Sequence, residues 1–447
     1  MLRTSLDKTP MSNRIHIAVL GRMNSGKSSL INAICGQDVS VVSPIAGTTT
    51  DIVHKAMEIH GLGPVVFIDT PGIDDESVLA EARIARTQRA INKADMALVV
   101  IDATCGVGEP ESALLAELGM KRIPYIVAIN KADIAPVAGS DADDLSRSAD
   151  SSGWGDSAYG CSSSVAGCAQ RVDDHRSHAL AKDVSRVSVS ALTGEGVIQL
   201  IEYIRTLASQ AEVWDGPPIV GDLLAPGDTV VLVIPEDAEA PKGRLILPQV
   251  QTIRDILDHN AVATAMRVAQ LETVFADRSF RPRLVITDSQ AFREVDAIVP
   301  SFVDLTSFSI LFARHKGDLE LLARGARVID SLEPGDSVLI VEACTHHPVD
   351  DDIGTVKIPR LLNRKAGGEL SFEWRRGADF PADLARFKLV VHCGGCMLNR
   401  REMVSRLSAV EDTGVPVTNY GMTIAACLGI LPRALRPLGV AMEKTPV

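Results

Sequence analysis

The sequence predicts an α/β protein whose parallel sheets are covered by helices on both faces. Apolar strand-like runs at residues 14–21, 96–102 and 125–130 alternate with segments of helical periodicity, which is the pattern of βαβ units. The chain has 447 residues, of which 46% are hydrophobic and 23% are charged. That length is enough for several domains with hydrophobic cores of their own. We therefore expect successive α/β domains.

The composition argues against several classes of protein. Every long apolar run is interrupted before the roughly 18 residues that a membrane-spanning helix needs, so we expect no membrane association. The net charge of −12 argues against a general affinity for nucleic acid. Eight unevenly spaced cysteines in so long a chain are typical of a reducing compartment rather than of a disulfide scaffold. The N-terminal residues lack the apolar stretch of a secretory signal, so we expect a cytoplasmic location.

The first domain is expected at residues 14–212, after an N-terminal tail of residues 1–13. Besides the strands above, it contains an apolar strand at 64–69 and a polar helix at 77–93. The βαβ rhythm stops at residues 137–183, where Ser, Asp and Gly dominate. We interpret that stretch as a disordered insertion. A strand and a helix then complete the domain, and their expected ranges are 184–190 and 197–209.

Two further α/β domains are expected after a Gly-Pro-Pro linker. The second domain, at residues 217–304, is predicted to contain a strand at 229–235, a helix at 249–267 and a strand at 283–287. The third domain is expected at residues 305–447. It begins with one long amphipathic helix, and apolar strands follow at 337–344, at 387–394 and, as a short segment, at 415–419.

A phosphate-binding loop follows the first strand of the chain. Residues 21–28, GRMNSGKS, match the pattern G-x-x-x-x-G-K-S/T between a strand and a helix. In such a loop the backbone amides and the N-terminus of the following helix bind phosphates. Lys27 is expected to reach the β- and γ-phosphates, and the Ser28 hydroxyl is expected to bind Mg²⁺.

Three further segments, each at the end of a predicted strand, complete a guanine nucleotide site. Residues 69–72 (DTPG) offer the Asp69 carboxylate to the magnesium shell and the Gly72 amide to the γ-phosphate. Asp133 of the segment NKAD can accept two hydrogen bonds from guanine N1 and N2 groups, which adenine does not offer. Residues 190–192 (SAL) close the base pocket. The predicted nucleotide contacts are Gly21, Asn24, Ser25, Gly26, Lys27, Ser28, Ser29, Asp69, Thr70, Pro71, Gly72, Asn130, Lys131, Asp133, Ser190, Ala191 and Leu192.

This order of motifs resembles that of the Ras-like P-loop GTPases, and residues 47–51 (GTTTD) resemble switch I of the Era/TrmE branch. The resemblance implies that Thr49 binds Mg²⁺, with Thr48 and Thr50 as alternatives. It also implies that Asn24 helps to bind a potassium ion near the β- and γ-phosphates. Ile73 stands where Ras-type enzymes carry a water-positioning Gln, so we expect hydrolysis that depends on potassium or on a partner. The predicted catalytic residues are Lys27, Asn24, Thr49 and Gly72.

Cysteine and histidine residues follow two strands of the third domain. Residues 344–347 read CTHH, and residues 392–396 read HCGGC. If both strands belong to one parallel sheet, Cys344, Cys393 and Cys396 lie at the same edge. The spacing is compatible with a Cys₃His zinc site, or with a [4Fe–4S] cluster on three thiolates with an exchangeable fourth ligand. A thioredoxin-like redox pair and buried cysteines without a ligand are further alternatives. The pattern alone leaves all four open.

The whole combination resembles one family, the maturation GTPases of [FeFe]-hydrogenase called HydF. The resemblance rests on the Era/TrmE-like motifs, the middle α/β domain, and the segments CTHH and HCGGC. It implies that residues 217–304 form a dimerisation domain and that residues 305–447 bind a [4Fe–4S] cluster through Cys344, Cys393 and Cys396. His346 and His392 are the candidate fourth ligands, and His347 is a weaker one.

The resemblance also implies a role as a GTP-hydrolysing scaffold or carrier. Such a protein receives the diiron precursor of the H-cluster from two radical-SAM maturases and delivers it to apo-[FeFe]-hydrogenase. The expected cofactors are GTP, Mg²⁺, K⁺, the [4Fe–4S] cluster and the transient diiron precursor, and a homodimer is expected. The alternative is an RNA-associated GTPase of ribosome assembly or tRNA modification with a zinc-binding C-terminal domain. The acidic composition counts against that alternative.

Overall fold

The computed structural model describes residues 9–36, 39–45, 53–73, 80–134, 185–210, 216–235, 245–343, 352–377, 380–381 and 383–440. It divides into two units, one made of His16–Ile91 and Asp95–Ala211, the other of Met1–Ile15, Asn92–Ala94 and Glu212–Val447. The predicted insertion at 137–183 lies outside the described residues, as do Thr48, Thr49, Thr50, Cys344, His346 and His347. No helix in the described ranges has both the length and the apolar character needed to span a bilayer.

The first unit is built on a seven-stranded sheet with the order β2-β3-β4-β1-β5-β6-β7. Strands β1, β5, β6 and β7 are parallel, whereas β2 and β3 form an antiparallel hairpin that continues into β4. The strands are β1 (Ile15–Leu20), β2 (Val39–Ile45), β3 (Val53–Ile59), β4 (Gly63–Asp69), β5 (Met96–Asp102), β6 (Tyr125–Asn130) and β7 (Arg186–Ser188). This is the predicted Ras-like fold, and the predicted ranges of β5 and β6 are confirmed to the residue.

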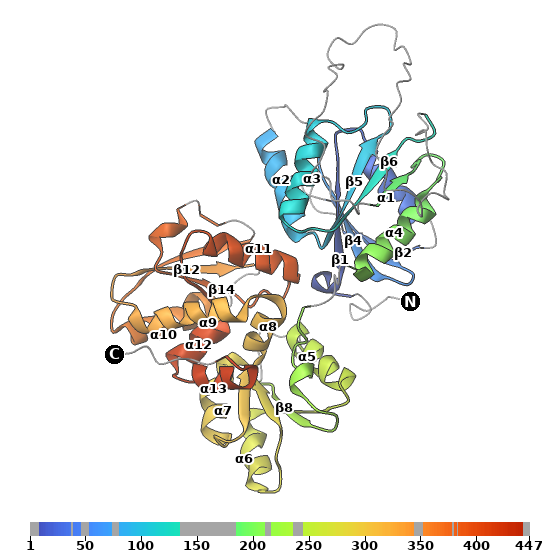
Figure 1. Cartoon of the computed structure of the whole chain (residues 1–447). Coiled ribbons are helices and arrows are strands. Elements are labelled where there is room, and N and C mark those ends of the chain that lie inside the picture. The colour runs from blue at the N-terminus through green and yellow to red at the C-terminus, as the bar shows by residue number, and fades with distance from the viewer. Residues whose placement is uncertain are drawn as a thin grey trace, which may run out of the picture. The chain divides into compact units, whose positions relative to one another are not determined.

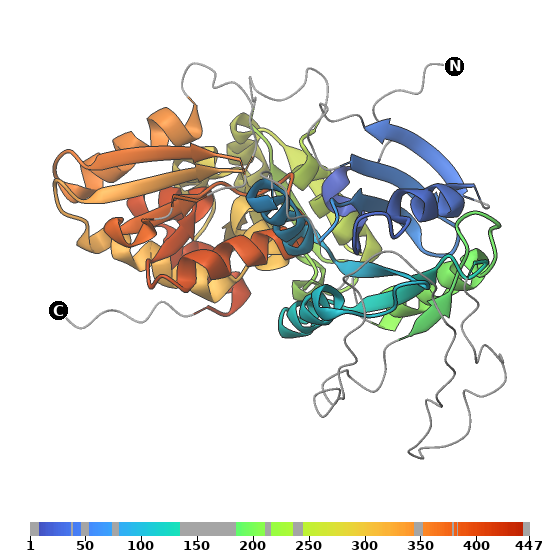
Figure 2. The same cartoon turned by 90° about the horizontal axis from the view of Figure 1, so that it is seen from above.

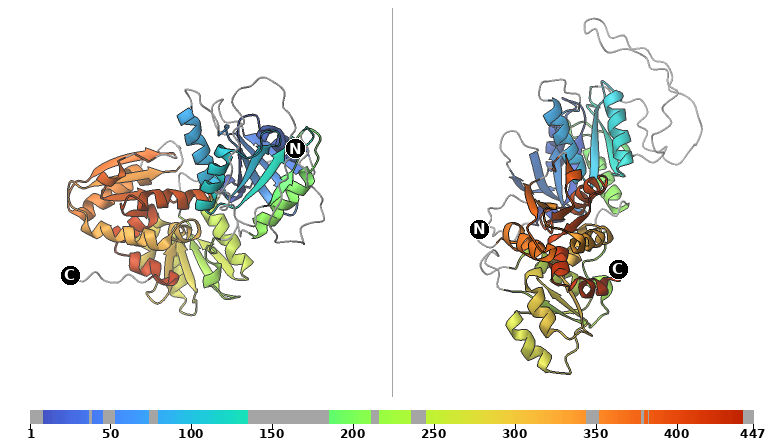
Figure 3. Two further views of the ribbon diagram at one scale, coloured as in Figure 1. Left: turned by 45° about the horizontal axis from the view of Figure 1, so that its top comes forward. Right: turned by 90° about the vertical axis from the view of Figure 1, so that its left-hand side faces the viewer.

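Four helices cover the two faces of this sheet. Helices α2 (Ala80–Lys93) and α3 (Glu109–Met120) lie on one face, and α1 (Lys27–Cys35) and α4 (Val197–Gln210) lie on the other (Figure 1). The blue α1 and the green α4 are side by side (Figure 3). The β2–β3 hairpin was not predicted, because polar residues such as Lys55 and Glu58 interrupt the apolar pattern of an edge strand.

The second unit contains two four-stranded parallel sheets, of which the first has the order β11-β10-β8-β9. Its strands are β8 (Thr229–Val233), β9 (Val262–Met266), β10 (Leu284–Thr287) and β11 (Asp304–Ser307). Helix α5 (Leu247–Asp258) lies on one side of these strands, and α6 (Val268–Ala276) and α7 (Phe292–Ile298) lie on the other (Figure 1).

The first of these sheets corrects two sequence predictions. The helix predicted at 249–267 ends at Asp258, because Asn260 takes a left-handed turn with φ 57° and the chain then enters β9. The predicted domain boundary between residues 304 and 305 would cut β11, which pairs along its whole length with β10. The pairing therefore assigns residues 304–307 to the middle domain.

The second sheet has the order β13-β12-β14-β15. Its parallel strands are β12 (Ser337–Glu342), β13 (Ser371–Arg376), β14 (Leu389–His392) and β15 (Val417–Asn419), and Figure 2 shows its orange strands side by side. Helices α9, α10 and α12 gather on one face, and α11 lies on the other (Figure 1). The helices of this region are α8 (Phe308–Lys316), α9 (Leu319–Arg327), α10 (Ile358–Ala366), α11 (Arg400–Glu411), α12 (Tyr420–Cys427) and α13 (Leu431–Leu435).

The long amphipathic helix predicted at the start of the third domain is wrong, because two helices occupy that range. Helix α8 ends at Lys316, and the Asp318 side chain caps α9 by accepting a hydrogen bond of 2.9 Å from the Leu321 amide. The break turns α8 so that Phe308, Leu311 and Phe312 pack in the core of the middle sheet, while Ile310 joins the other core. Each such buried side chain contributes about 1.5–3 kcal/mol, and α8 thereby joins the two sheets.

Candidate functional site

The phosphate-binding loop lies between β1 and α1 and depends on close backbone approach. Gly26 has φ 89°, and a Cβ atom there would lie 2.2 Å from Nδ2 of Asn130. A Cβ atom on Gly21 would lie 2.2 Å from the carbonyl oxygen of Val100. Both positions therefore need glycine. Asn24, the predicted potassium ligand, is exposed and left-handed with φ 61°, so its side chain projects from the tip of the loop.

Lys27 is buried beneath this loop. Its Nζ atom donates hydrogen bonds of 2.9 Å to the carbonyl oxygen of Gly21 and 2.7 Å to that of Arg22. The ammonium group therefore already lies inside the curve of the loop, where phosphate oxygens bind in P-loop proteins. Ser29 lies on the exposed first turn of α1, and Ser25 is buried within the loop.

The two predicted magnesium ligands that the structure describes are in contact. The Ser28 hydroxyl donates a hydrogen bond of 2.5 Å to Oδ2 of Asp69, although 41 residues separate them. The other carboxylate oxygen, Oδ1 of Asp69, is buried and has no hydrogen-bond partner among the described residues. A hydroxyl and a carboxylate with an unsatisfied oxygen are a donor set that fits Mg²⁺.

The segment after Asp69 packs directly on the phosphate-binding loop. The Thr70 hydroxyl donates a 2.7 Å hydrogen bond to the carbonyl oxygen of Val19, and the Ile73 amide donates to Gly21 at 3.3 Å. A Cβ atom on Gly72 would lie 2.5 Å from the Met23 amide nitrogen, so only glycine fits. Gly72 and the half-buried Pro71 therefore lie against the phosphate-binding loop, and Thr70 anchors the segment to β1.

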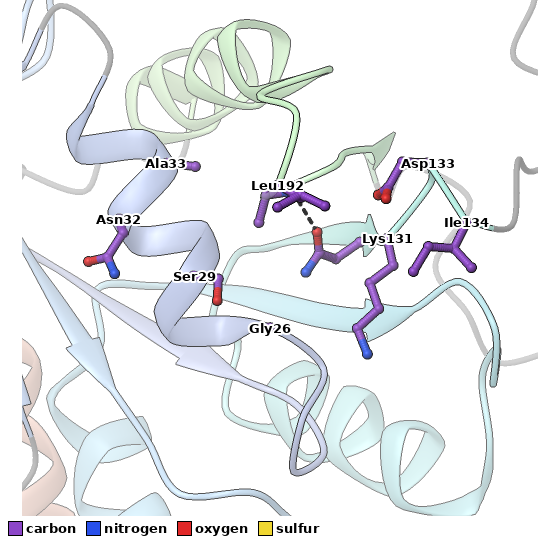
Figure 4. Close-up of a pocket in the computed structure, with 10 residues that line it drawn as sticks. Gly26, Ser29, Asn32, Ala33, Lys131, Asp133, Ile134 and Leu192 are labelled. Atoms are coloured by element: carbon purple, nitrogen blue, oxygen red, sulfur yellow. Dashed lines mark hydrogen bonds between the residues drawn. The ribbon is translucent and has the colours of Figure 1, made fainter.

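A pocket of about 590 Å³ lies between α1 and the ends of β6 and β7, a size typical of small-molecule sites. Figure 4 shows Lys131, Asp133 and Leu192 on the side facing Ser29 of α1. Leu192 is 85% exposed and is available to cover a flat ligand. The pocket is lined by Gly26, Ser29, Asn32, Ala33, Asn130, Lys131, Asp133, Ile134, Ala191 and Leu192.

Asn130 joins the three loops around this pocket. Its Nδ2 atom donates to the Ser25 carbonyl oxygen at 2.9 Å, and its Oδ1 atom accepts a 3.0 Å hydrogen bond from the Ala191 amide (Figure 4). Ser190 is fully buried, and its hydroxyl accepts a hydrogen bond of 3.1 Å from the Thr193 amide. Asn130 therefore both lines the pocket and holds its loops together, whereas Ser190 acts through the backbone of its own loop.

Lys131 is held beside the pocket by an ion pair. Its Nζ atom lies 2.6 Å from Oδ2 of Asp102, at the end of the neighbouring strand. Burial by itself would raise the pKa of Asp102, but hydrogen bonds from Lys131 and Thr104 lower it below the usual range. Asp102 therefore stays ionised and keeps the Lys131 stem along the pocket wall.

The sequence prediction missed a second anchor of the phosphate-binding loop. Nη2 of Arg22 donates a hydrogen bond of 2.7 Å to Oε2 of Glu111, which is 2% exposed. The same oxygen accepts a 2.9 Å hydrogen bond from the Gly108 amide at the start of α3. Glu111 lies in the first turn of α3, a position that favours acidic residues but does not identify a partner.

The two strands that precede the predicted cysteine ligands belong to one parallel sheet, as expected, and they are neighbours in it. Strands β12 and β14 are parallel, and Val341 pairs with His392. The amide of Ala343, the residue before Cys344, donates a 3.2 Å hydrogen bond to Sγ of Cys393. Within the described ranges no group of three His, Cys, Asp or Glu side chains lies close enough to hold a metal. Cys393 and Cys396 are the described members of the predicted set.

The loop between these two cysteines is shaped for a sulfur-ligated group. Gly395 has φ 60°, and a Cβ atom there would approach Sδ of Met403 to 3.1 Å, so glycine fits best. Helix α11 begins immediately after the loop, capped by Asn399, which accepts a 3.0 Å hydrogen bond from the Glu402 amide. A backbone N–H already directed at a cysteine sulfur and a helix N-terminus nearby both favour thiolates. The residues present fit a thiolate-bound metal.

The ring of His392 is engaged in hydrogen bonds within the protein. Its Nε2 atom accepts a 2.9 Å hydrogen bond from Nε of Arg406, which can only donate, so the proton of the neutral ring belongs on Nδ1, 2.7 Å from the Cys393 carbonyl oxygen. Burial and the nearby Arg406 lower the pKa of His392 to about 3. Both ring nitrogens are engaged within the protein, which counts against the prediction of His392 as a fourth ligand.

Two cations that the sequence prediction missed hold the loop. Lys316 at the end of α8 is 3% exposed, and its Nζ atom donates to the carbonyl oxygens of Cys396 at 3.0 Å and Leu398 at 2.9 Å. Arg400 donates in the opposite direction, to the His315 carbonyl oxygen at 2.7 Å. Burial lowers the pKa of Lys316 to about 8, against the Coulombic influence of Cys396, which raises it.

Family models match all three parts of the chain. Residues 16–131 match the "50S ribosome-binding GTPase" domain, residues 219–317 match the "Hydrogen maturase F dimerization domain", and residues 320–437 match the "Hydrogen maturase F tetramerization domain". The boundary between the matched dimerization and tetramerization domains agrees with the assignment of β11 and α8 to the middle domain. The chain therefore carries a GTPase domain, as predicted.

Individual relatives are similar to this chain over about a quarter of its length. GTPase Der of Solidesulfovibrio magneticus is 41% identical over 126 residues, which are 27% of this chain and 28% of that protein. The tRNA modification GTPase MnmE of Acetivibrio thermocellus is 39% identical over 121 residues, 27% of this chain and 26% of that protein. The chain thus spans about a quarter of each. A solved structure of Era from Aquifex aeolicus has a TM-score of 0.30 and 20% identity, over 56% of this chain and 93% of that one, a likeness too low to support an argument.

The family assignment follows from the order of the three matches. GTPase domains of this kind occur in relatives named for other tasks, so the first domain does not distinguish them. The two domains that follow it match models specific to hydrogen maturase F. As the resemblance implied, the chain belongs to the hydrogen maturase F family, HydF.

Proposed function

We propose that this protein is a GTP-hydrolysing scaffold that binds a [4Fe–4S] cluster and delivers the diiron precursor of the H-cluster to apo-[FeFe]-hydrogenase. The observation that carries the proposal is the hydrogen bond from Ala343 to Sγ of Cys393. It brings the end of β12, just before Cys344, to the CGGC loop. This occurs in a chain whose last two domains match hydrogen maturase F.

In the first domain, GTP binding would use the groups that are already assembled. The Lys27 ammonium lies under the phosphate-binding loop and would offset the charge of the β- and γ-phosphates. Ser28 and Asp69 would hold Mg²⁺, which supplies charge neutralisation at the phosphates. Asp133 faces the pocket and would accept the guanine N1 and N2 hydrogens. Thr49, which lies outside the described residues, is the proposed third ligand of Mg²⁺.

We expect GTP hydrolysis to be faster in KCl than in NaCl at equal ionic strength, by about tenfold or more. The reason is that Ile73 cannot orient water, whereas a potassium ion at Asn24 would stabilise charge that develops between the phosphates; tenfold corresponds to about 1.4 kcal/mol. The measurement is the steady-state rate of phosphate release. Asn24→Ala should remove the difference between the salts, and equal rates in wild-type protein would overturn the role of Asn24.

In the third domain, Cys344, Cys393 and Cys396 would hold the cluster, which supplies an iron with an exchangeable ligand. The chain's own contribution is to present thiolates: the Ala343 amide faces the Cys393 sulfur, and Gly395 lets the loop turn tightly. His346 or an external ligand is proposed as the fourth ligand, because Arg406 and the Cys393 carbonyl engage both nitrogens of His392.

The family matches indicate that the protein oligomerises, since its last two domains are named for dimerization and tetramerization. We propose a homodimer. Strand β9 is the edge of the middle sheet, and its first residue, Val262, is 50% exposed; such an edge can pair with another strand. Two radical-SAM maturases and apo-hydrogenase are the proposed partners, in a reducing cytoplasm.

The proposed function predicts a brown, oxygen-labile protein when it is purified without oxygen. The measurements are iron and sulfide content, the visible spectrum, and the EPR spectrum after reduction by dithionite. A [4Fe–4S] cluster should give about four irons and four sulfides per chain by its stoichiometry. A colourless protein with stoichiometric zinc would overturn the proposal, and zinc together with co-purified RNA would favour the RNA-associated alternative.

A further inference from the structure

The buried lysine at the end of α8 has no acidic partner in the described part of the chain. Lys316 is 3% exposed, and its contacts there are two carbonyl oxygens and the Phe312 ring, whose centroid lies 5.6 Å from Nζ. Burying an ammonium group without a counter-charge is costly. The carbonyl oxygens solvate the group, but they do not neutralise its charge. This position therefore favours an anion nearby.

The acceptors of Lys316 belong to the loop that carries the cysteines. Nζ binds the carbonyl oxygen of Cys396 itself and that of Leu398, at 3.0 and 2.9 Å. Arg400, the first residue of α11, binds the carbonyl oxygens of His315 at 2.7 Å and of Arg314 and Gly317 at 3.3 Å. Lys316 of α8 thus binds residues 396–398, and Arg400 of α11 binds the end of α8 in return.

A bound anion explains the burial of Lys316 at this position better than the needs of the fold alone. The negative end of the α8 dipole already has Arg400 as its cation, so Lys316 is not needed for that purpose. Arg400 also donates to the Gly317 carbonyl oxygen, so it ties the start of α11 to the end of α8 without Lys316. Lys316 adds a desolvated positive charge, and its Nζ atom lies 3.0 Å from the carbonyl oxygen of Cys396. Because a thiolate-bound iron–sulfur group is anionic and becomes more so when reduced, that charge would stabilise it.

We propose that Lys316 is a positioning residue of the metal centre: its ammonium holds the Cys396 turn and supplies the positive charge that an anionic thiolate–metal group requires. The proposal rests on the proposed function, since it takes the group to be an iron–sulfur cluster. Lys316 touches the backbone of the ligand loop, and so it acts through Cys396 rather than on iron.

The proposal is tested with Lys316→Met and Lys316→Gln in the full-length, anaerobically purified protein. Met removes the charge and the donors, while Gln keeps a donor and removes only the charge. Lys388→Met is the matched control, because Lys388 is exposed and directly precedes β14, at the end of the strand opposite to Cys393. The readouts are the midpoint potential from EPR-monitored titration, the rate of iron loss to a chelator, and the melting temperature.

Both Lys316 variants should shift the midpoint potential to more negative values, because loss of a positive charge disfavours the reduced cluster. Iron loss should be about 10-fold to 100-fold faster, the range typical of residues that support metal ligands, and Gln should retain iron better than Met. The Lys388→Met variant should match wild type. An apolar side chain of similar volume, such as Met, can replace a buried charge without unfolding the protein.

The outcomes separate this inference from the proposed function. If wild-type protein holds no iron–sulfur cluster, the proposed function fails, and this inference fails with it. If wild type holds the cluster while both Lys316 variants keep its potential and retention, only the role of Lys316 is overturned. If both variants fail to fold without metal, Lys316 serves the fold, and the inference is likewise overturned.

Discussion

Cys393→Ser and Cys396→Ser are each expected to reduce the bound iron to background while the rate of GTP hydrolysis stays within about twofold of wild type. A serine hydroxyl is a harder and far less acidic ligand than a thiol, so it does not replace a thiolate on iron. The nucleotide groups belong to a different unit of the structure, so their geometry should not depend on these sulfurs. Iron analysis, EPR and phosphate release measure the two effects separately.

Cys427→Ser is the matched control for these variants. Cys427 lies at the end of α12 and packs against the hydrophobic core, and burial raises the pKa of its thiol to about 12, so it stays protonated at neutral pH. The same substitution there should leave the iron content unchanged. Full iron content in Cys393→Ser would remove that residue from the ligand set. Loss of hydrolysis at an unchanged melting temperature would contradict the independence of the two sites.

Lys27→Ala is expected to have the opposite effect: GTP hydrolysis falls by about 10²- to 10³-fold, and the iron content and EPR signal remain. The Lys27 ammonium is the buried cation of the phosphate-binding loop, bound to the carbonyl oxygens of Gly21 and Arg22. Removing a preorganised charge from such a site costs about 3–4 kcal/mol in the transition state. Single-turnover hydrolysis and binding of a fluorescent GTP analogue distinguish loss of chemistry from loss of affinity.

Lys121→Ala provides the comparison for a lysine outside the site. Lys121 follows α3 and pairs with Glu117 at 3.0 Å on the surface, a pair worth at most about 1 kcal/mol. Hydrolysis by this variant should equal that of wild type. Near-normal hydrolysis by Lys27→Ala would contradict the assignment of the phosphate-binding loop, and loss of the cluster in that variant would show that the two sites depend on each other.

The nucleotide site was predictable because its motifs are short, continuous and placed at strand ends. In a parallel sheet the carboxyl ends of neighbouring strands meet at one edge, so Ser28 and Asp69 come together although they are far apart in the chain. The same reasoning placed the ends of the strands before Cys344 and Cys393 at one edge of a parallel sheet, and the parallel pairing of β12 with β14 agrees with that placement. The sequence pattern also located β5 and β6 to the residue, because each is an apolar run that ends in one polar residue.

Other features depend on partners that no local pattern specifies. A His beside two cysteines was predicted as a candidate ligand, yet Arg406 occupies its Nε2 atom. Lys316 looked like an ordinary helix residue, but the fold buries it against Cys396, which lies 80 positions away. Similarly, the predicted boundary between residues 304 and 305 cuts β11, because the domain of that strand is decided by its hydrogen bonds to β10.

The sequence alone determined which chemistry the chain carries, namely a phosphate-binding loop with a guanine-type base motif and a set of cysteines at strand ends. The tertiary structure decided which side chains are available to bind the nucleotide or the metal, and which have their polar atoms engaged within the protein. The physical reason is that burial and hydrogen-bond partners are properties of packed elements distant in the chain. The fold engages both ring nitrogens of His392 in hydrogen bonds. It also buries Lys316, whose Nζ atom binds the carbonyl oxygen of Cys396.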